Sequence, residues 1–273
     1  MIDLHSHILP GLDDGAGAMG ETLGMVCQLQ AAGFQTLMAT PHVLEGRGFL
    51  SPEQILAATE EVRREIAAAG IKVNILPGAE NYIFPALAKA ARAGQLLTLG
   101  NTGKYLLLEL PLLEIPRYTE QVFFDLQAEG ITPVLAHPER YRALAAKPEH
   151  LLAWSRQGVL FQVDLLSLNG RYGLRAMRLA EIMLRSGLAH FLGSDAHRVA
   201  GTEPGYREAL AQARSIVGEE KFQELTAGNA AALLAGKLRQ NGEESFLAEL
   251  PIRKKWYQNL WRRLAGRENN LTG

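Results

Sequence analysis

Short apolar runs alternate with longer amphipathic stretches along most of the chain. The short runs are bounded by glycine, proline or polar turn residues, which is the pattern of buried strands. The predicted strands are Ile2–Leu4, Thr36–Ala39, Lys72–Leu76, Tyr105–Leu110, Thr132–Leu135, Val159–Val163 and Ala189–Leu192. The longer stretches repeat apolar residues at i, i+3 and i+4 and so predict helices. The predicted helices are Glu21–Ala32, Pro52–Ala69, Phe84–Ala93, Arg117–Glu129, Pro148–Arg156 and Gly173–Ser186.

Residues at the ends of these stretches support the predicted helices. A glycine, the preferred residue for ending a helix, lies at or close to the end of most of them. These glycines are Gly33, Gly70, Gly94, Gly130, Gly158 and Gly187. Ser51 followed by Pro52 is the expected N-cap followed by proline in the first helical position.

The alternation predicts an α/β fold of seven βα units. The links are short, so each helix must return the chain to begin the next strand in the same direction, which makes the strands parallel. If the strands close into a barrel, all their carboxyl ends lie on one face. No repeat or linker interrupts residues 1–250, which we interpret as one domain followed by a separate tail, residues 251–273.

Imidazole and carboxylate side chains recur where the predicted strands end. His5 and His7 are separated by one residue, and residues i and i+2 of a strand point to the same face. The other candidate metal ligands at strand ends are His42, Glu80, Glu109, His137, Asp195 and His197. Nitrogen and oxygen donors without thiolate suit Mn, Fe(II) or Zn, and Mg less well. This number of donors could hold two or three ions, an arrangement suited to phosphoester hydrolysis.

Two further groups could complete such a site. Asp14 precedes a turn glycine that would let its carboxylate fold back toward the histidine pair, and Asp13 is its rival for that role. Arg140 follows His137 closely, and a guanidinium binds phosphate through two parallel hydrogen bonds. We interpret Arg140 as the group that binds the substrate phosphate. The alternative for Arg140 is a salt bridge to a neighbouring acid.

Several other polar residues are assigned to ordinary structural positions. We place Gln162 and Asp164 near the rim of the site. We expect His150 and His190 to be surface or core residues, and Cys27 to be a small core residue of an amphipathic helix. Glu139 could be a ligand, but we expect it to be solvated or paired.

Composition narrows the class of protein. The chain has 273 residues, of which 47% are hydrophobic and 21% charged, as in soluble globular proteins. No run reaches the roughly 18 apolar residues that a membrane-spanning helix needs, and we recognise no signal peptide. The single cysteine excludes an intrachain disulfide, so we expect a cytoplasmic protein. The sequence leaves the oligomeric state open.

Charge is unevenly distributed along the chain. Residues 251–273 hold six Lys or Arg and one acid, so this tail carries +5 and the remaining residues carry −6. An acidic body disfavours nucleic acid as a substrate. Trp256, Trp261, Tyr257, Leu260 and Leu264 would share one side of a helix in the tail. We therefore predict that the tail either lies at a membrane surface or packs as a last helix on the domain.

Six sequence strings together resemble a known family. They are Asp3-Leu-His-Ser-His-Ile-Leu-Pro-Gly-Leu-Asp-Asp-Gly-Ala16, Thr40-Pro-His42, Gly78-Ala-Glu80, Leu108-Glu109, Ala136-His-Pro-Glu-Arg140 and Gly193-Ser-Asp-Ala-His197. This set resembles the polymerase and histidinol phosphatase (PHP) superfamily. Within that superfamily it most resembles the bacterial manganese-dependent protein tyrosine phosphatases of capsule and exopolysaccharide loci.

The resemblance implies a fold and a metal site. The implied fold is a distorted (β/α)7 barrel, similar to a TIM barrel, with three metal ions, most simply Mn²⁺. The first ion would be held by His5, His7, Glu80 and Asp195. The second would be held by Glu80, Glu109 and His137, and the third by Asp14, His42 and His197.

The resemblance also implies the reaction. The substrate would be phosphotyrosine on a membrane-associated bacterial tyrosine kinase that controls polysaccharide export. We assign catalytic roles to Arg140, His137 and Asp195. A second arginine commonly contacts the phosphate in this family, and Arg198 and Arg47 are the candidates, although Arg198 comes earlier than expected. The alternative function is a small-molecule phosphatase of the same superfamily, such as a histidinol-phosphate phosphatase.

Overall fold

The fold is described by a computed structural model, which covers residues 1–44, 50–199 and 203–238. All seven predicted strands are present, most with slightly shifted ends. The strands are β1 (Ile2–Ser6), β2 (Thr36–Ala39), β3 (His42–Val43), β4 (Asn74–Pro77), β5 (Glu80–Tyr82), β6 (Tyr105–Glu109), β7 (Thr132–Ala136), β8 (Leu160–Asp164) and β9 (Phe191–Gly193). The short strands β3 and β5 were not predicted, and they begin at the candidate ligands His42 and Glu80.

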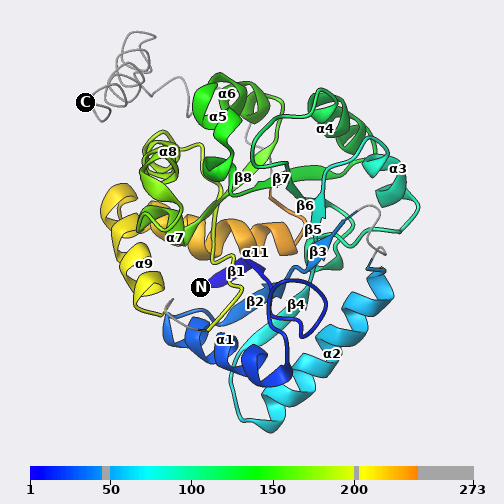
Figure 1. The fold of residues 1–273 in the computed structure, drawn as a ribbon, viewed down its shortest axis with the longest axis vertical. Helices are drawn as coiled ribbons and strands as arrows, with labels where there is room; N and C mark the ends of the chain where they lie inside the picture. The colour runs from blue at the N-terminus through cyan, green and yellow to red at the C-terminus, as the bar shows by residue number, and fades with distance from the viewer. Residues whose placement is uncertain (45–49, 200–202, 239–273) are drawn as a thin grey trace. The chain divides into compact units, whose positions relative to one another are not determined.

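Helices link most of the strands, and Figure 1 shows several of them arranged around the strands. The helices are α1 (Met19–Ala31), α2 (Pro52–Ala68), α3 (Leu87–Arg92), α4 (Thr119–Ala128), α5 (Arg142–Ala146), α6 (Glu149–Arg156), α7 (Leu165–Leu168), α8 (Gly173–Arg185), α9 (Glu203–Val217), α10 (Glu219–Gln223) and α11 (Asn229–Leu234). The six predicted helices are confirmed, but the sequence analysis missed α5, α7 and α9 to α11. The hydroxyl of Ser51 accepts a hydrogen bond from Gln54 N–H, so the predicted N-cap of α2 is correct.

All strand pairs are parallel, as predicted. The strands form one sheet with the order β1-β2-β4 and another with the order β3-β5-β6-β7-β8-β9. The chain passes directly from β2 to β3 and from β4 to β5, and hydrogen bonds from Gly78 N–H to Ala39 O (2.9 Å) and from Glu80 N–H to Pro41 O (3.1 Å) continue the pairing of the first sheet into the second. Others join the first strand to the last, from His7 N–H to Ala196 O and from Asp195 N–H to His5 O, both at 2.9 Å.

The register of β1 changes in the middle of the strand. Asp3 pairs with Leu37, and Ser6 pairs with Ala39. Two residues of β1, Leu4 and His5, therefore stand opposite the single residue Met38, which is the arrangement of a β-bulge. A bulge re-aims the side chains that follow it. In a regular strand, Leu4 and its neighbour His5 would point to opposite faces. The bulge lets both side chains face the interior, Leu4 in the apolar core and His5 in the polar cluster described below.

Apolar side chains from the strands and from α11 fill the interior. They alternate along the strands, as the two-residue period of a strand requires. The cluster contains Leu4, Met38, Leu99, Tyr105, Leu107, Val134, Ala136, Leu160, Phe191, Ala230 and Leu233. Extending the same alternation brings Glu109, Gln162 and Asp164 to the inward face at the carboxyl ends of β6 and β8.

One expected core residue is not in the core. Cys27 of α1 is exposed, because the buried positions of that helix follow the stripe Thr22, Met25, Val26 and Leu29. No helix within the described residues has the length and apolar character that a membrane span requires. Residues 251–273 and Arg47 lie outside the described residues, so the predictions for them remain predictions.

Candidate metal centre

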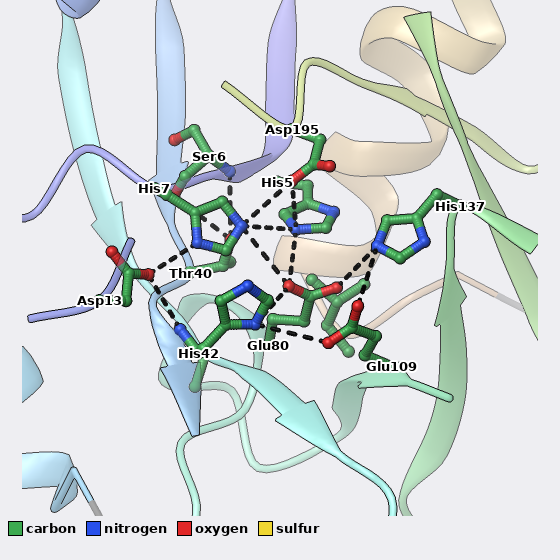
Figure 2. Close-up of polar contacts among 12 residues, drawn as sticks. His5, Ser6, His7, Asp13, Thr40, His42, Glu80, Glu109, His137 and Asp195 are labelled. Atoms are coloured by element: carbon green, nitrogen blue, oxygen red, sulfur yellow. Dashed lines mark hydrogen bonds and ion pairs between the residues drawn. The ribbon is translucent and has the colours of Figure 1, made fainter. Parts of the chain in front are cut away.

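The predicted ligands converge at the carboxyl ends of the parallel strands, as Figure 2 shows for most of them. His5 lies inside β1 rather than directly after it, because the strand ends at Ser6 and not at Leu4, and His7 follows the strand directly. His42 begins β3 and Glu80 begins β5. The remaining ligands end or follow later strands, with Glu109 ending β6, His137 following β7, and Asp195 and His197 following β9.

The most buried group consists of two imidazoles and two carboxylates. Nε2 of His5 lies 3.2 Å from Oε2 of Glu80 and 3.2 Å from Oδ1 of Asp195. Nε2 of His7 lies 3.5 Å and 3.1 Å from the same two oxygens. The two Nε2 atoms are 3.1 Å apart. Four ligand atoms thus face one another closely enough to share one metal ion.

Glu80 connects this group to a second one. Its Oε1 lies 3.0 Å from Nε2 of His137, which is 3.9 Å from Oε1 of Glu109. Its Oε2 lies 3.0 Å from Nδ1 of His42, which is 3.6 Å from Oε2 of Glu109. Oε2 also faces His5 and His7 of the first group, whereas Oε1 faces His137, so this carboxylate reaches both groups as a bridging ligand does. The second group therefore offers His42 as well as His137.

A third group lies around Asp14. Its Oδ1 is 3.5 Å from Nε2 of His42 and 3.4 Å from Nε2 of His197, and a ligand atom of His7 lies within reach of all three. Of the two rival aspartates, Asp14 is the one whose carboxylate joins these histidines. The resemblance placed His42 in the third group alone, whereas the structure places it between the second and the third.

Two polar residues orient the histidines of the first group. Oε1 of Gln162 lies 2.8 Å from Nδ1 of His5, and Oδ2 of Asp13 lies 2.7 Å from Nδ1 of His7. Each acceptor favours the proton on Nδ1 and leaves Nε2 free to bind a metal. Gln162 is completely buried rather than at the rim. A polar residue inside the apolar run Leu160–Asp164 was the signal that could have identified it.

Burial and neighbouring charges shift the pKa values of the residues in this cluster. Burial works against a charged His5, but Glu80 and Asp195 outweigh it and raise the pKa of His5 to about 9. Burial and the neighbouring Glu80 raise the pKa of Glu109 to about 7. The pKa of His137 falls to about 4, because burial and the charge of Arg140 disfavour the imidazolium.

The chemistry of these side chains fits divalent metal ions. Within the described residues, Oε2 of Glu80, Oδ1 of Asp195 and Nδ1 of His42 are buried and lie at ion-pair distance from neighbouring ligand atoms, but none of the three makes a hydrogen bond. Buried polar atoms of this kind are costly unless a partner compensates them. His137 and Asp195 also adopt positive φ angles of 33° and 45°, an unfavourable backbone state that concentrates at functional sites.

Arg140 faces this cluster and is held on three sides. Its Nη1 donates to Oδ2 of Asp195 and lies 3.5 Å from Oδ2 of Asp164. Its Cζ lies 4.3 Å from the ring centre of Tyr172, a cation–π contact. The salt bridge considered as the alternative for Arg140 is therefore present, and the same contacts orient the guanidinium beside the cluster. Tyr172 was not recognised from the sequence.

A cavity of about 260 Å³ opens beside the candidate ligands. It is lined by Asp14, Arg140, Leu166, Arg171, Tyr172, Asp195, His197, Arg198 and Tyr206. Arg198 therefore lies beside candidate ligands, and its role in substrate binding stays a prediction.

The sequence analysis predicted the surroundings of some other polar residues correctly and of others incorrectly. Glu139 is buried rather than solvated, and its Oε1 accepts hydrogen bonds from Asp164 N–H and the Ser167 hydroxyl. Asp164 is also fully buried, where the sequence analysis put it near the rim. His190 lies away from the cluster, and its Nδ1 accepts a hydrogen bond from Phe161 N–H, as expected of a core residue.

Relatives of the chain carry names that bear on this cluster. Residues 1–235 match the family model described as capsular polysaccharide synthesis, CpsB/CapC. The chain is 36% identical over 220 residues to tyrosine-protein phosphatase YwqE of Bacillus subtilis, covering 81% of this chain and 86% of that protein. It is 33% identical over 199 residues to the putative tyrosine-protein phosphatase CapC of Staphylococcus aureus, covering 73% and 78%.

The fold is also similar to a crystal structure from work on YwqE of Bacillus subtilis and CpsB of Streptococcus pneumoniae, proteins described there as metal-dependent tyrosine phosphatases. The TM-score is 0.82 at 35% identity, and the match covers 87% of this chain and 95% of the other. The family match spans every candidate ligand from His5 to His197. The chain belongs to the CpsB/CapC family of capsular polysaccharide synthesis.

Proposed function

We propose that this protein is a metal-dependent phosphatase that hydrolyses phosphotyrosine on proteins. The observation that carries the proposal is the cluster of His5, His7, Glu80 and Asp195, in a chain whose relatives are named tyrosine-protein phosphatases. The physiological substrate is a bacterial tyrosine kinase that controls capsular or exopolysaccharide synthesis, in the cytoplasm at the inner face of the membrane. The family description supports the link to capsule synthesis.

The proposed site holds up to three ions, with Mn²⁺ as the first choice. His5, His7, Glu80 and Asp195 would hold the first ion, and Glu80 would also reach the second. Glu109 and His137 would hold the second ion with it, and Asp14, His42 and His197 would hold the third. The distances within the first and third groups and the buried atoms without hydrogen bonds support this assignment. For the second ion, the support for His137 is its distance of 3.0 Å from Glu80, and His42 lies close to Glu80 and Glu109 as well. Bound divalent ions lower the pKa of water and neutralise phosphoryl oxygens.

The chain's own residues orient the substrate. The Arg140 guanidinium binds two phosphoryl oxygens and stabilises the charge that they gain in the transition state. Asp164 and Tyr172 hold that guanidinium in place. Gln162 and Asp13 fix the tautomers of His5 and His7. Arg198 offers a second cationic group at the cavity, and Arg47 remains a further candidate.

We further propose that the strands close into a distorted (β/α)7 barrel. The hydrogen bonds between β1 and the segment after β9, together with those joining the two sheets, support closure. Residues 1–250 form this domain and residues 251–273 form the basic tail. A liposome co-sedimentation assay of the full chain against a chain ending at Leu250 tests the tail, and equal binding of both contradicts membrane contact.

The function is tested by metal stripping and reconstitution. The stripped protein is given Mn, Fe(II), Zn or Mg, and phosphate release is measured from a phosphotyrosine peptide, a phosphoserine peptide and histidinol phosphate. We expect Mn²⁺ to restore hydrolysis of the phosphotyrosine peptide preferentially. Preference for histidinol phosphate supports the alternative, a small-molecule phosphatase. No hydrolysis of any substrate with any metal contradicts both functions.

A further inference from the structure

The cavity beside the metal-binding residues has polar groups that the proposed reaction does not use. Asp14, Asp195 and His197 line it, so a substrate phosphate at the metal-binding residues occupies part of this space. Its volume of about 260 Å³ is close to the lower end of ligand pockets, which begin at about 300 Å³. The remaining lining includes Arg171 and Tyr206, which belong to none of the groups of candidate ligands.

The two arginines Arg140 and Arg171 are used differently. Arg140 is engaged by Asp164, Asp195 and the Tyr172 ring. Arg171 lies in the turn before α8, and its backbone N–H donates to Leu166 O. Among the residues that the structure covers, its guanidinium forms no ion pair with a carboxylate. A guanidinium that lines a cavity and forms no ion pair can bind an anionic group of a ligand by donating two parallel hydrogen bonds to it.

The hydroxyl of Tyr206 is the second unused donor. The side chain is 1% exposed, and within the described residues its Oη has no hydrogen-bond partner. Buried tyrosine hydroxyls usually find a partner, because leaving one unpaired costs free energy. Burial raises the pKa of Tyr206, as do Asp164, Asp3 and Asp195, while the charge of Arg171 lowers it. Because Arg171 and Tyr206 line the same cavity, one ligand in that cavity can meet both side chains.

We propose that Arg171 and Tyr206 form a subsite for a second anionic group of the substrate, next to the phosphotyrosine. The guanidinium binds the anion through paired hydrogen bonds, and the Tyr206 hydroxyl donates a third. The group is either the carboxylate of an acidic residue flanking the phosphotyrosine or the phosphate of a neighbouring phosphotyrosine. This inference rests on the proposed phosphatase function and specifies which peptides that function prefers.

The test compares peptides that differ only beside the phosphotyrosine. Three peptides carry Glu, Gln or a second phosphotyrosine at the flanking positions, and kcat/KM is measured for each with the Mn-loaded protein. Because hydrogen bonds to charged groups are worth about 10-fold to 100-fold, we expect the Glu peptide to exceed the Gln peptide by at least about 10-fold. The peptide with two phosphotyrosines tells whether phosphate or carboxylate binds better.

Variants then locate the preference. Arg171→Gln should bring the ratio between Glu and Gln peptides close to one, and Tyr206→Phe should reduce it by about threefold to tenfold. Tyr206→Phe removes only a hydroxyl without a partner, so its melting temperature should match the wild type. Arg185→Gln, at the other end of α8 and away from the cavity, is the matched control and should keep the wild-type ratio.

Each outcome bears on one part of the inference. Equal rates of the wild type on all three peptides overturn the subsite while leaving the phosphatase function intact. A preference that survives in both Arg171→Gln and Tyr206→Phe overturns the assignment to these residues. Failure to hydrolyse free phosphotyrosine as well as the peptides overturns the proposed function and this inference with it.

Discussion

The two ends of the parallel strands are built from different side chains. At the carboxyl ends, His5 and Glu80 are fully buried among charged and polar groups. Further toward the amino ends, side chains such as Tyr105, Leu160 and Phe191 pack against one another and against α11. Apolar burial stabilises the fold, whereas burying charges costs free energy unless they are paired. The molecule thus separates the region that stabilises it from the region that carries its chemistry.

Two histidines illustrate the difference. His5, at the carboxyl end of β1, has a pKa raised to about 9, since Glu80 and Asp195 outweigh the effect of burial. His190, just before β9, has a pKa lowered to about 4 by burial and by the positive charge of Lys221. The same imidazole is favoured as a cation at one end and as a neutral group at the other. Nearby carboxylates decide which applies.

The largest expected effect is at the carboxyl ends. Glu80→Gln removes the carboxylate that connects the first two groups of ligands, and we expect kcat/KM for a phosphotyrosine peptide to fall by at least about 10²–10³-fold. The exposed Glu65→Gln on α2 is the matched control and should keep full activity. Near wild-type turnover of Glu80→Gln with excess Mn²⁺ would contradict the proposed centre.

A substitution in the apolar half should lower the stability of the fold and leave the activity of the folded protein largely unchanged. Phe191→Ala leaves a cavity in the core, and we expect the free energy of unfolding to fall by about 3–5 kcal/mol. The measurement is chemical denaturation of the metal-free protein, with metal content and activity determined below the transition. The comparison fails if the folded Phe191→Ala protein loses activity as severely as Glu80→Gln.

The next effect concerns His190 and pH. Its pKa in the folded protein is about 4, below the value of about 6.5 in an unfolded chain. Below pH 6.5 the unfolded state therefore takes up a proton first, and this contribution to stability is lost as the pH falls toward 4. His190→Gln can still accept from Phe161 N–H, and between pH 6.5 and 4 its unfolding free energy should fall by up to about 3 kcal/mol less than that of the wild type. An unchanged pH dependence between 6.5 and 4 would show that His190 is not buried as a neutral ring.

The smallest expected effect concerns a residue that supports a ligand. Gln162→Leu removes the acceptor for Nδ1 of His5, and we expect Mn²⁺ affinity to fall by about 10-fold to 100-fold. Activity at saturating Mn²⁺ should largely return, because the ligand itself remains. Gln162→Glu keeps an acceptor and should bind Mn²⁺ more tightly than Gln162→Leu in a metal titration. Equal affinity of the two variants would exclude this role for Gln162.

The sequence predicted more of the ligands than of their supports. Ligands such as His42 and Glu80 follow apolar strand patterns, and their residue types signal metal chemistry directly. Tyr172 and Tyr206 lie beside neighbours that are distant in the chain, so no local pattern marks them, whereas Gln162 is marked only by its position inside an apolar run. Helices α9 to α11 were missed, and Cys27 was misplaced. Burial on a helix depends on which face the rest of the fold covers.

The sequence by itself determined the parallel α/β arrangement and the donor types at the strand ends. Periodicity, helix caps and turn residues act over a few positions, so they can be recognised without a structure. The tertiary structure decided which residues meet. The bulge in β1 places both Leu4 and His5 opposite Met38, and hydrogen bonds from His7 and Asp195 bring the first and last strand segments together. These two hydrogen bonds join residues about 190 positions apart, and they form only because strands that are distant in the chain lie together, which local periodicity does not reveal.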